Sequence, residues 1–425
     1  MRSSIVRVLG VLPLLIGVPL WGQAQEKNKI FDTLTYDQQA GLPAAASKIY
    51  FSDSRFTLSG FYESNYTHYT GPKNRLSNDI ELYNTHLNRF VMYAAYKPTK
   101  KVVLYAEVFA ELLHDGGLEH DFEFQPEVFA DFLFSPQFNM RLGSHQVQIG
   151  YVNNNDEPIL FYSVNRPELE RLIIPSTWID LGVMTYGMLN QDLKWSASVY
   201  QGLDPTQMNG SSWIRQGRSE VTRFEFSGAT LNGSLKYTGI PHTELAITGL
   251  YSHIGAHNVR SDLFLVSPYV RYNQGRFSAM ALAASGGVSN TEQIRNSTSL
   301  TTENIDPILG SRVGGYYIEL GYDLFPFFKS KKPRRDGFWY RSSEIKVPVF
   351  ARFEQLNTHR QVRSQVMPDS YIPQSNLMAL TTGFNIVPRK NIVIKCNYQF
   401  RDNRVLLPNG EREGNTLELG LGVLF

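Results

Sequence analysis

The sequence predicts an all-β fold: a transmembrane antiparallel β-barrel of about 16 strands, with short periplasmic turns and long external loops. Three observations lead to this class. From Arg55 to Phe425, segments of about ten residues alternate apolar and polar side chains. Short and long connections between these segments alternate along the chain. Aromatic residues make up 13% of the chain, yet no long, nearly uncharged apolar run of the kind that forms a transmembrane helix follows the N-terminal region.

The first residues have the pattern of an export signal. Arg2 and Arg7 lie before and at the edge of a short apolar stretch, residues 8–20, and Gly22-Gln23-Ala24 offers the small residues that a signal peptidase recognises. We therefore predict a signal peptide over residues 1–24. No cysteine follows it directly, so a lipoprotein is not expected.

Two regions follow the predicted signal peptide. Residues 25–54 show little periodicity, and we predict that they form a periplasmic N-terminal extension. Residues 55–425 form the predicted barrel. In its final segment the odd-numbered residues from 417 to 425 are apolar, whereas the alternate residues Glu418, Gly420 and Gly422 are polar or small. Apolar side chains are expected to face lipid, and the others a wet lumen.

The remaining strands and turns follow from the same alternation. Strands are predicted near residues 55–66, 86–97, 101–111, 127–135, 138–148, 179–189, 192–202, 222–236, 242–252, 263–272, 276–285, 314–324, 345–355, 376–387, 391–400 and 416–425. Long loops are predicted near 67–85, 112–126, 149–178, 203–221, 286–313, 356–375 and 401–415. The connection 325–344 stands at the position of a short turn, yet it is long and basic.

The third long loop, residues 149–178, is too apolar to lie freely in solvent. It contains Ile159, Leu160, Phe161, Leu172, Ile173, Ile174 and Trp178. We predict that it packs against the lumen wall and narrows the pore. Four of its charged residues are then candidates for a constriction that selects among solutes: Glu157, Arg166, Glu168 and Arg171. The alternative is that the arginines only pair with neighbouring glutamates and hold the loop in place.

Alternation places further charged side chains inside the barrel. Each lies out of phase with apolar neighbours in its strand, and the basic candidates are Arg141, His145, Arg271, Arg352 and Lys395. Glu319 and Glu354 are expected to face inward as well and to offset this charge. The alternative for each is a lumen charge without a role in selectivity, because a polar interior needs polar residues at every such position.

Other protein classes find little support in the sequence. A formal net charge of +2 lacks the basic excess of a nucleic-acid binder, and the lone cysteine, Cys396, can form neither an internal disulfide nor a cysteine-based metal cluster. His253 and His257 lie at a strand end and in a loop, with no third ligand near in sequence. No phosphate-binding glycine loop and no nucleophile elbow occurs. We therefore expect no enzyme activity, no cofactor, no metal and no nucleic-acid partner.

Several runs resemble the phosphate-selective porin O and P family. They are Glu157-Pro158, Asn165-Arg166-Pro167-Glu168, Ile173-Ile174-Pro175-Ser176-Thr177-Trp178, Gly202-Leu203-Asp204, Ile214-Arg215-Gln216-Gly217-Arg218, the stretch from Tyr316 to Phe325, and the last three strands. This resemblance implies a sixteen-stranded barrel, often a homotrimer, that passes anions. Selective members of the family carry lysines in the constriction, whereas residues 149–178 contain none.

These observations predict a porin in the bacterial outer membrane. Its expected partners are outer-membrane lipid, small hydrophilic solutes or anions such as phosphate, and the outer-membrane assembly machinery, for which Phe425 on an amphipathic last strand resembles the recognition signal. The alternative is a barrel without transport activity that serves as an assembly, secretion or adhesion platform. The basic connection 325–344 motivates this alternative.

Overall fold

The structure is a computed structural model. It describes residues 38–219, 228–298, 306–328, 336–363, 365 and 371–425. The predicted signal peptide, residues 1–24, and the basic residues 329–335 lie outside the described residues.

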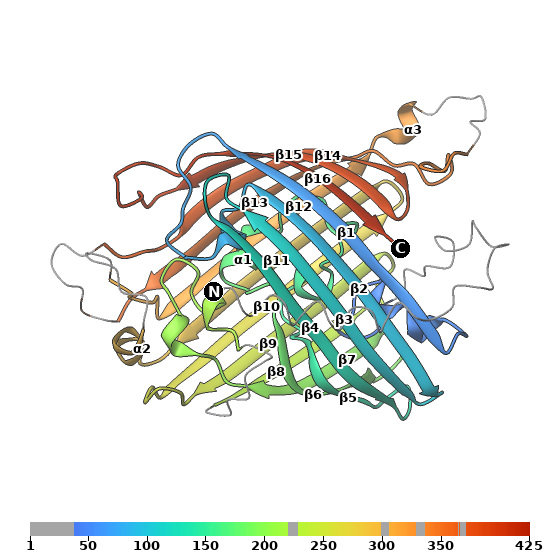
Figure 1. Ribbon diagram of the computed structural model, residues 1–425, viewed down its shortest axis with the longest axis horizontal. Helices are drawn as coiled ribbons and strands as arrows, with labels where there is room; N and C mark the ends of the chain where they lie inside the picture. Colours follow the sequence, from blue (N-terminus) through green and yellow to red (C-terminus); the bar gives the residue numbers. More distant parts are fainter. Residues whose placement is uncertain (1–37, 220–227, 299–305, 329–335, 364, 366–370) are drawn as a thin grey trace, which may run out of the picture.

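Sixteen strands form one closed antiparallel ring, which confirms the predicted fold class (Figure 1). Each strand pairs with its neighbours in sequence, and β1 pairs with β16 to close the ring. The strands are β1 Phe56–Tyr69, β2 His86–Thr99, β3 Val102–His114, β4 His120–Leu133, β5 Asn139–Gln146, β6 Ile179–Met188, β7 Leu193–Gln201, β8 Ala229–Tyr237, β9 Thr243–Ile254, β10 Ser261–Gln274, β11 Phe277–Val288, β12 Arg312–Asp323, β13 Pro348–Gln361, β14 Asn376–Arg389, β15 Ile392–Asn403 and β16 Thr416–Leu424.

Side chains alternate between the two faces of the ring as the sequence predicts. In β16, Leu417, Leu419 and Leu421 are exposed on the outside, whereas Glu418 is buried inside. Cys396 lies in the outward phase of β15, between the exposed Ile394 and Phe400. A closed ring satisfies every strand's hydrogen bonds within the sheet, so the outer face can be apolar throughout.

The helices are short and lie in the connections. The α-helices are α1 Glu168–Leu172, α2 Thr291–Ser297 and α3 Phe325–Phe328, and the 3₁₀ turns are η3 Ala46–Phe51, η4 Ile80–Leu82, η5 Val152–Asn154, η6 Pro205–Gln207 and η7 Arg215–Gly217. In Figure 1, α1 lies within the ring of strands, while α2 and α3 lie beyond opposite rims. Across the described ranges, no helix combines the length and apolar character needed to cross a membrane.

One predicted long loop is wrong. Residues 112–126 were expected to be a loop, but β3 and β4 extend until only residues 115–119 connect them. The polar residues in this stretch belong to strands, since Glu111 and Glu123 pair on one face while Leu112 and Phe122 pair on the other. The alternation continues past the expected strand ends because these strands are longer than a membrane span requires.

Two segments without strands fill much of the lumen. One is the connection between β5 and β6, residues 147–178, called here the inward loop. The other comprises residues 38–51, called here the N-terminal segment; it belongs to the region predicted as a periplasmic extension, and it contacts lumen-facing side chains of β1, β4 and β6. Both segments therefore lie inside the barrel and contact its wall.

Candidate functional site

The inward loop is held in the lumen by its apolar side chains. Ile173, Ile174 and Trp178 are fully buried in one cluster with wall residues such as Leu265 and Tyr317. Burying a large apolar side chain contributes roughly 1.5–3 kcal/mol, so several such residues fix the loop against the wall. The predicted inward fold of residues 149–178 is confirmed by this packing.

Glu170 fastens the loop to the barrel wall. One carboxylate oxygen accepts hydrogen bonds from the backbone nitrogens of Tyr151 and Val152, at 2.7 and 2.6 Å. The other accepts a hydrogen bond from the hydroxyl of Tyr317 on β12 at 2.7 Å. A buried carboxylate needs such partners, and here they join the two ends of the loop to a strand.

Glycines on the wall make room for the loop. A Cβ atom added at Gly422 would lie 2.5 Å from the ring of Pro158, and one at Gly315 would lie 2.7 Å from Leu169. The small residues on the inner face of β12 and β16 therefore accommodate the loop, in addition to suiting a wet lumen. Only glycine permits so close an approach without a shift of the loop.

Glu157 joins the inward loop to the N-terminal segment. Its carboxylate accepts a hydrogen bond from the backbone nitrogen of Ala45 at 2.7 Å, and Ala45 in turn accepts one from the hydroxyl of Ser59 on β1. Burial, assisted by the neighbouring Asp156, raises the pKa of Glu157 to about 8. Glu157 therefore has a structural contact and lines neither of the two cavities described below.

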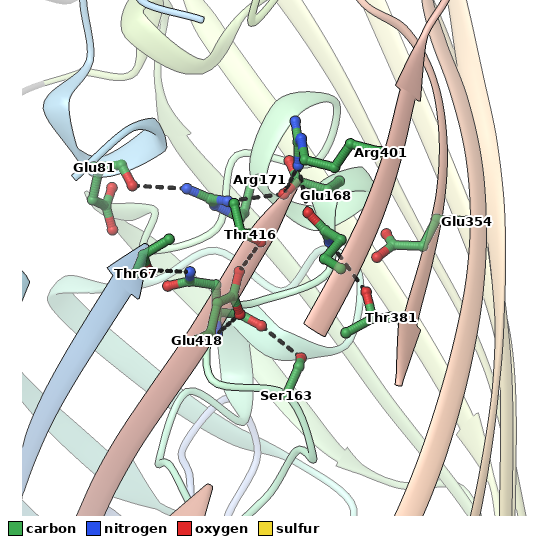
Figure 2. A network of polar contacts seen from close by, with 12 residues as sticks. Thr67, Glu81, Ser163, Glu168, Arg171, Glu354, Thr381, Arg401, Thr416 and Glu418 are labelled. Atoms are coloured by element: carbon green, nitrogen blue, oxygen red, sulfur yellow. Dashed lines mark hydrogen bonds and ion pairs between the residues drawn. The ribbon is translucent and has the colours of Figure 1, made fainter. Parts of the chain in front are cut away.

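Glu168 lies in a network of ion pairs at the start of α1. Figure 2 shows its carboxylate between Arg171 and Arg401, at 3.0 and 2.7 Å. Arg171 also donates to the carbonyl of Glu81 in the first external loop at 2.8 Å. Burial alone would raise the pKa of Glu168, but the two arginines hold it below its usual value. These pairs fix the loop, as the alternative interpretation of Arg171 and Glu168 anticipated.

A small polar cavity lies on the external side of the inward loop. It has a volume of about 30 Å³, close to the share of one water molecule. Four arginines line it, Arg89, Arg166, Arg171 and Arg215, together with Glu63 and Glu81. We call it the external cavity.

The arginines of the external cavity differ in how completely they are paired. Arg89 lies 3.2 Å from Glu63 and also contacts Glu111, and Arg215 lies 2.6 Å from Asp79. Arg166 is less well compensated: its nearest carboxylate, Asp156, is 3.9 Å away, and its Nη2 atom has no hydrogen-bond partner. Burial and the neighbouring Arg89 lower the pKa of Arg166 to about 10. The external cavity thus retains positive charge at Arg166.

A larger cavity lies on the side of the short turns. It has a volume of about 700 Å³ and reaches from the inward loop to the periplasmic ends of β10 to β15. Its basic lining residues are Arg271, Arg276, Lys346, Arg352 and Lys390, and its acidic ones are Glu319, Asp323 and Glu344. We call it the periplasmic cavity.

Phe161 of the inward loop lines both cavities. Lys395 on β15 holds it, because the ammonium group donates to the carbonyls of Phe161 and Ser163 at 3.0 and 2.9 Å and lies 3.8 Å from the centre of the Phe161 ring. The neighbouring Tyr162 is fixed by a 2.6 Å hydrogen bond with Ser278. Phe161 therefore forms a wall between the two cavities, held in place by β15.

The structure brings only some of the predicted site residues together. Arg166 and Arg171 line the external cavity, Arg271 and Arg352 line the periplasmic cavity, and Lys395 lies between them. Arg141 and His145 also face inward, but they line neither cavity. Arg141 is fully buried against Asp131, at 3.0 Å, and His145 against Tyr200, at 3.1 Å.

Sequence reasoning did not single out Arg89, Arg215 or Phe161 as site residues. Both faces of β2 carry apolar residues, Leu87 inside and Phe90 outside. Alternation therefore did not show that Arg89 faces the lumen. Arg215 belongs to a run already noted in the family resemblance, but a loop residue's position cannot be read from periodicity. Phe161 was noted only as part of an apolar loop.

The histidines noted in the sequence have other contacts. His253 pairs with Asp262 at 3.0 Å, and His257 lies 3.8 Å from Asp204. Among the described residues, no group of three or more histidine, cysteine, aspartate or glutamate side chains could hold a metal ion.

The closed ring, its apolar outer face and its polar lumen define an outer-membrane β-barrel, and they place the chain in the bacterial outer membrane. No protein-family model matches the chain. An uncharacterized protein of Aquifex aeolicus (strain VF5) is 26% identical over 385 residues, which cover 86% of this chain and 80% of that protein.

Solved structures share the fold at low sequence identity. OprB from Pseudomonas putida aligns with a TM-score of 0.55 and 8% identity, covering 92% of this chain and 100% of OprB. A loop L8 deletion mutant of OmpT, an outer membrane protein of Vibrio cholerae, aligns with a TM-score of 0.50 and 8% identity, covering 87% and 99% of the two chains. The chain is therefore similar to these proteins in its barrel architecture.

Proposed function

We propose that the protein is a porin for the passive diffusion of small hydrophilic solutes. The observation that carries this proposal is the pair of cavities on opposite sides of the inward loop, each with charged side chains in its lining and with Phe161 as a shared wall. A solute that passes Phe161 would travel from one compartment to the other through the barrel. The inward loop sets the size limit, as a constriction inside a pore does.

Charge in the two cavities favours anions, including inorganic ones such as phosphate. In the external cavity three of the four arginines are paired with carboxylates and Arg166 is the exception. In the periplasmic cavity five basic side chains face three acidic ones. Arg166 adds a buried positive charge that Asp156 compensates only weakly. A net positive lining lowers the barrier for anions and raises it for cations.

Planar-bilayer recordings of the purified protein test both parts of this proposal. We expect discrete channel openings and a reversal potential in a KCl gradient that indicates anion preference. Arg166→Gln should shift the reversal potential towards cation preference, whereas Arg412→Gln, in an external loop with a side chain that is 67% exposed, should leave it unchanged. Absence of any channel opening at all voltages would refute the porin proposal.

A second candidate function is an interaction platform at the periplasmic rim. The connection between β12 and β13 exposes Phe327, Phe328, Phe338 and Trp339, each about two-thirds accessible. Exposed aromatic clusters of this kind mark binding surfaces more often than isolated apolar residues do. A barrel without conductance that binds a periplasmic protein stoichiometrically, and loses it in a Phe338→Ala/Trp339→Ala variant, would favour this function.

The proposed channel is expected to assemble as a homotrimer, as the family resemblance implies. Analytical ultracentrifugation in detergent, corrected for bound detergent, measures this directly. A monomeric mass would exclude the trimer and leave the channel proposal standing.

A further inference from the structure

We propose that the periplasmic cavity binds organic anions that carry one carboxylate on an apolar, ring-containing body. This inference rests on the proposed porin function and names the class of solute that the channel retains. It arises from three features of the cavity: its volume, an arginine beside the inward loop that has no acidic partner, and aromatic walls held in place by that loop.

The volume suits an organic solute. About 700 Å³ falls within the range of 300–1,000 Å³ that small-molecule sites occupy. An inorganic anion would leave most of this space to water. A body of one ring and a short chain would instead contact several walls at once.

Arg271 on β10 is the group that would bind the carboxylate. Its side chain lines the cavity and is half-buried, and none of the described carboxylates lies within 4.0 Å of it. Arg352, the other arginine deep in the cavity, is already engaged by Glu319 at 3.2 Å and Glu354 at 2.7 Å. A guanidinium group binds a carboxylate through two parallel hydrogen bonds. Arg276 also lines the cavity without an ion pair to a described carboxylate, but its guanidinium lies over the ring of Phe327 in the connection after β12. Arg271 is therefore the unpaired arginine that lies beside the inward loop.

Aromatic side chains lie beside Arg271. The guanidinium carbon is 5.5 Å from the centre of the Tyr151 ring, and Tyr162 and Phe161 continue the same wall along the inward loop. Met280 and Tyr317 form the opposite, barrel side of the cavity. A ligand with its carboxylate on Arg271 would thus place its apolar body between two apolar surfaces.

The aromatic wall is rigid before any ligand binds. Tyr162 is fixed by its hydrogen bond with Ser278 and stacks on Phe350 at 5.5 Å between ring centres. Lys395 holds the backbone of Phe161. Preorganised walls lower the entropy lost on binding, so even a small organic acid gains affinity here.

The position of the cavity predicts an asymmetry. The cavity lies on the short-turn side of Phe161, so a solute from that compartment reaches Arg271 without passing Phe161. A bound organic anion should therefore obstruct chloride current at a lower concentration when it is added from the short-turn side.

Benzoate and acetate are the probes for the test, since they share the carboxylate and differ in the ring. We expect saturable block of chloride current by benzoate, with a lower half-blocking concentration on one side of the bilayer, and no saturable block by acetate. Arg271→Gln should raise the half-blocking concentration roughly tenfold, because it removes a charge-assisted hydrogen bond. The control, Arg260→Gln in the connection between β9 and β10, should behave as the unmodified protein.

Calorimetric titration of benzoate into the detergent-solubilised protein separates the two proposals. Binding that is lost in Arg271→Gln supports the site even if the bilayer shows no channel, in which case only the porin proposal fails. Open channels together with no benzoate binding, or equal binding of acetate and benzoate, would overturn the proposed site and leave the porin intact.

Discussion

The carboxylate of Glu157 and the backbone nitrogen of Ala45 lie 2.7 Å apart, which joins the inward loop to the N-terminal segment inside the barrel. Two further contacts tie the same segment to the wall, from Gln39 to the hydroxyl of Tyr186 and from Tyr50 to Asp131. Leu42 and Ile49 are buried against lumen-facing residues. The two segments without strands therefore occupy the lumen as one connected unit.

Removal of the N-terminal segment should enlarge the channel. A chain that lacks residues 38–51 vacates the space along β1 to β6, so we expect its single-channel conductance to rise roughly twofold. Glu157→Ala, which removes only the hydrogen bonds from the backbone nitrogens of Ala45 and Ala46, should produce frequent switching between two conductance levels. Glu292→Ala on α2, far from this contact in sequence and at the external rim, is the control. Unchanged conductance in the deleted chain would show that the segment does not limit flow.

Phe161 should set the size limit of the pore. Phe161→Ala removes the shared wall of the two cavities, so larger solutes should pass, and we expect roughly a twofold gain in conductance. Swelling of proteoliposomes in sugars of increasing size measures the limit. The matched control is Phe327→Ala, on an exposed side chain of α3. Equal size limits in both variants would place the constriction elsewhere.

The contact between Gly422 and Pro158 should be sensitive to a single methyl group. Gly422→Ala places a Cβ atom 2.5 Å from a rigid proline ring, and we expect a loss of about 1–3 kcal/mol in unfolding free energy with a displaced loop. Gly249→Ala is an exacting control, because the same methyl group on β9 meets nothing within 4 Å. Thermal unfolding in detergent compares the two variants, and equal midpoints would contradict the packed arrangement.

The outer face should reject charge where it contacts lipid. Leu419 on β16 is 45% exposed on the outside of the ring, so Leu419→Lys should lower the unfolding free energy by about 2–4 kcal/mol if it lies near the bilayer midplane. Leu406→Lys, in the external loop after β15, should change it by less than about 0.5 kcal/mol. Denaturant titration from lipid vesicles measures both, and equal effects would mean that Leu419 does not face lipid.

Periodicity predicted the strands well because most strands have an apolar face towards lipid and a polar or small-residue face towards the lumen. All sixteen predicted segments overlap observed strands in the same order, and the final one, 416–425, matches within a residue. The main error in a strand falls where polar residues face inward beyond the membrane, as with Glu123 in β4. β2 was predicted correctly as a strand, but Arg89 was not recognised as facing inward, because both faces of β2 carry apolar residues. Where both faces of a strand are apolar, alternation does not show which side chains face the lumen and which face lipid.

The interior was harder to predict than the wall. The apolar content of residues 149–178 indicated that the loop would fold inward, because such a loop needs a surface to cover it. Residues 38–51 carry no comparable signal, because the contacts that hold Ala45 are made by its backbone with Glu157 and Ser59, which are distant in sequence. Contacts between segments distant in sequence leave no periodic trace.

The N-terminal segment and β1 are joined by residues 52–55 alone. An occupant on so short a tether is present at an effective concentration in the millimolar range or above, whatever the amount of protein. Dilution of the protein does not remove the N-terminal segment from the lumen. A solute that competes for the same space must bind more favourably than this tethered segment. Its occupancy is thus a property of the covalent chain and is independent of the protein concentration.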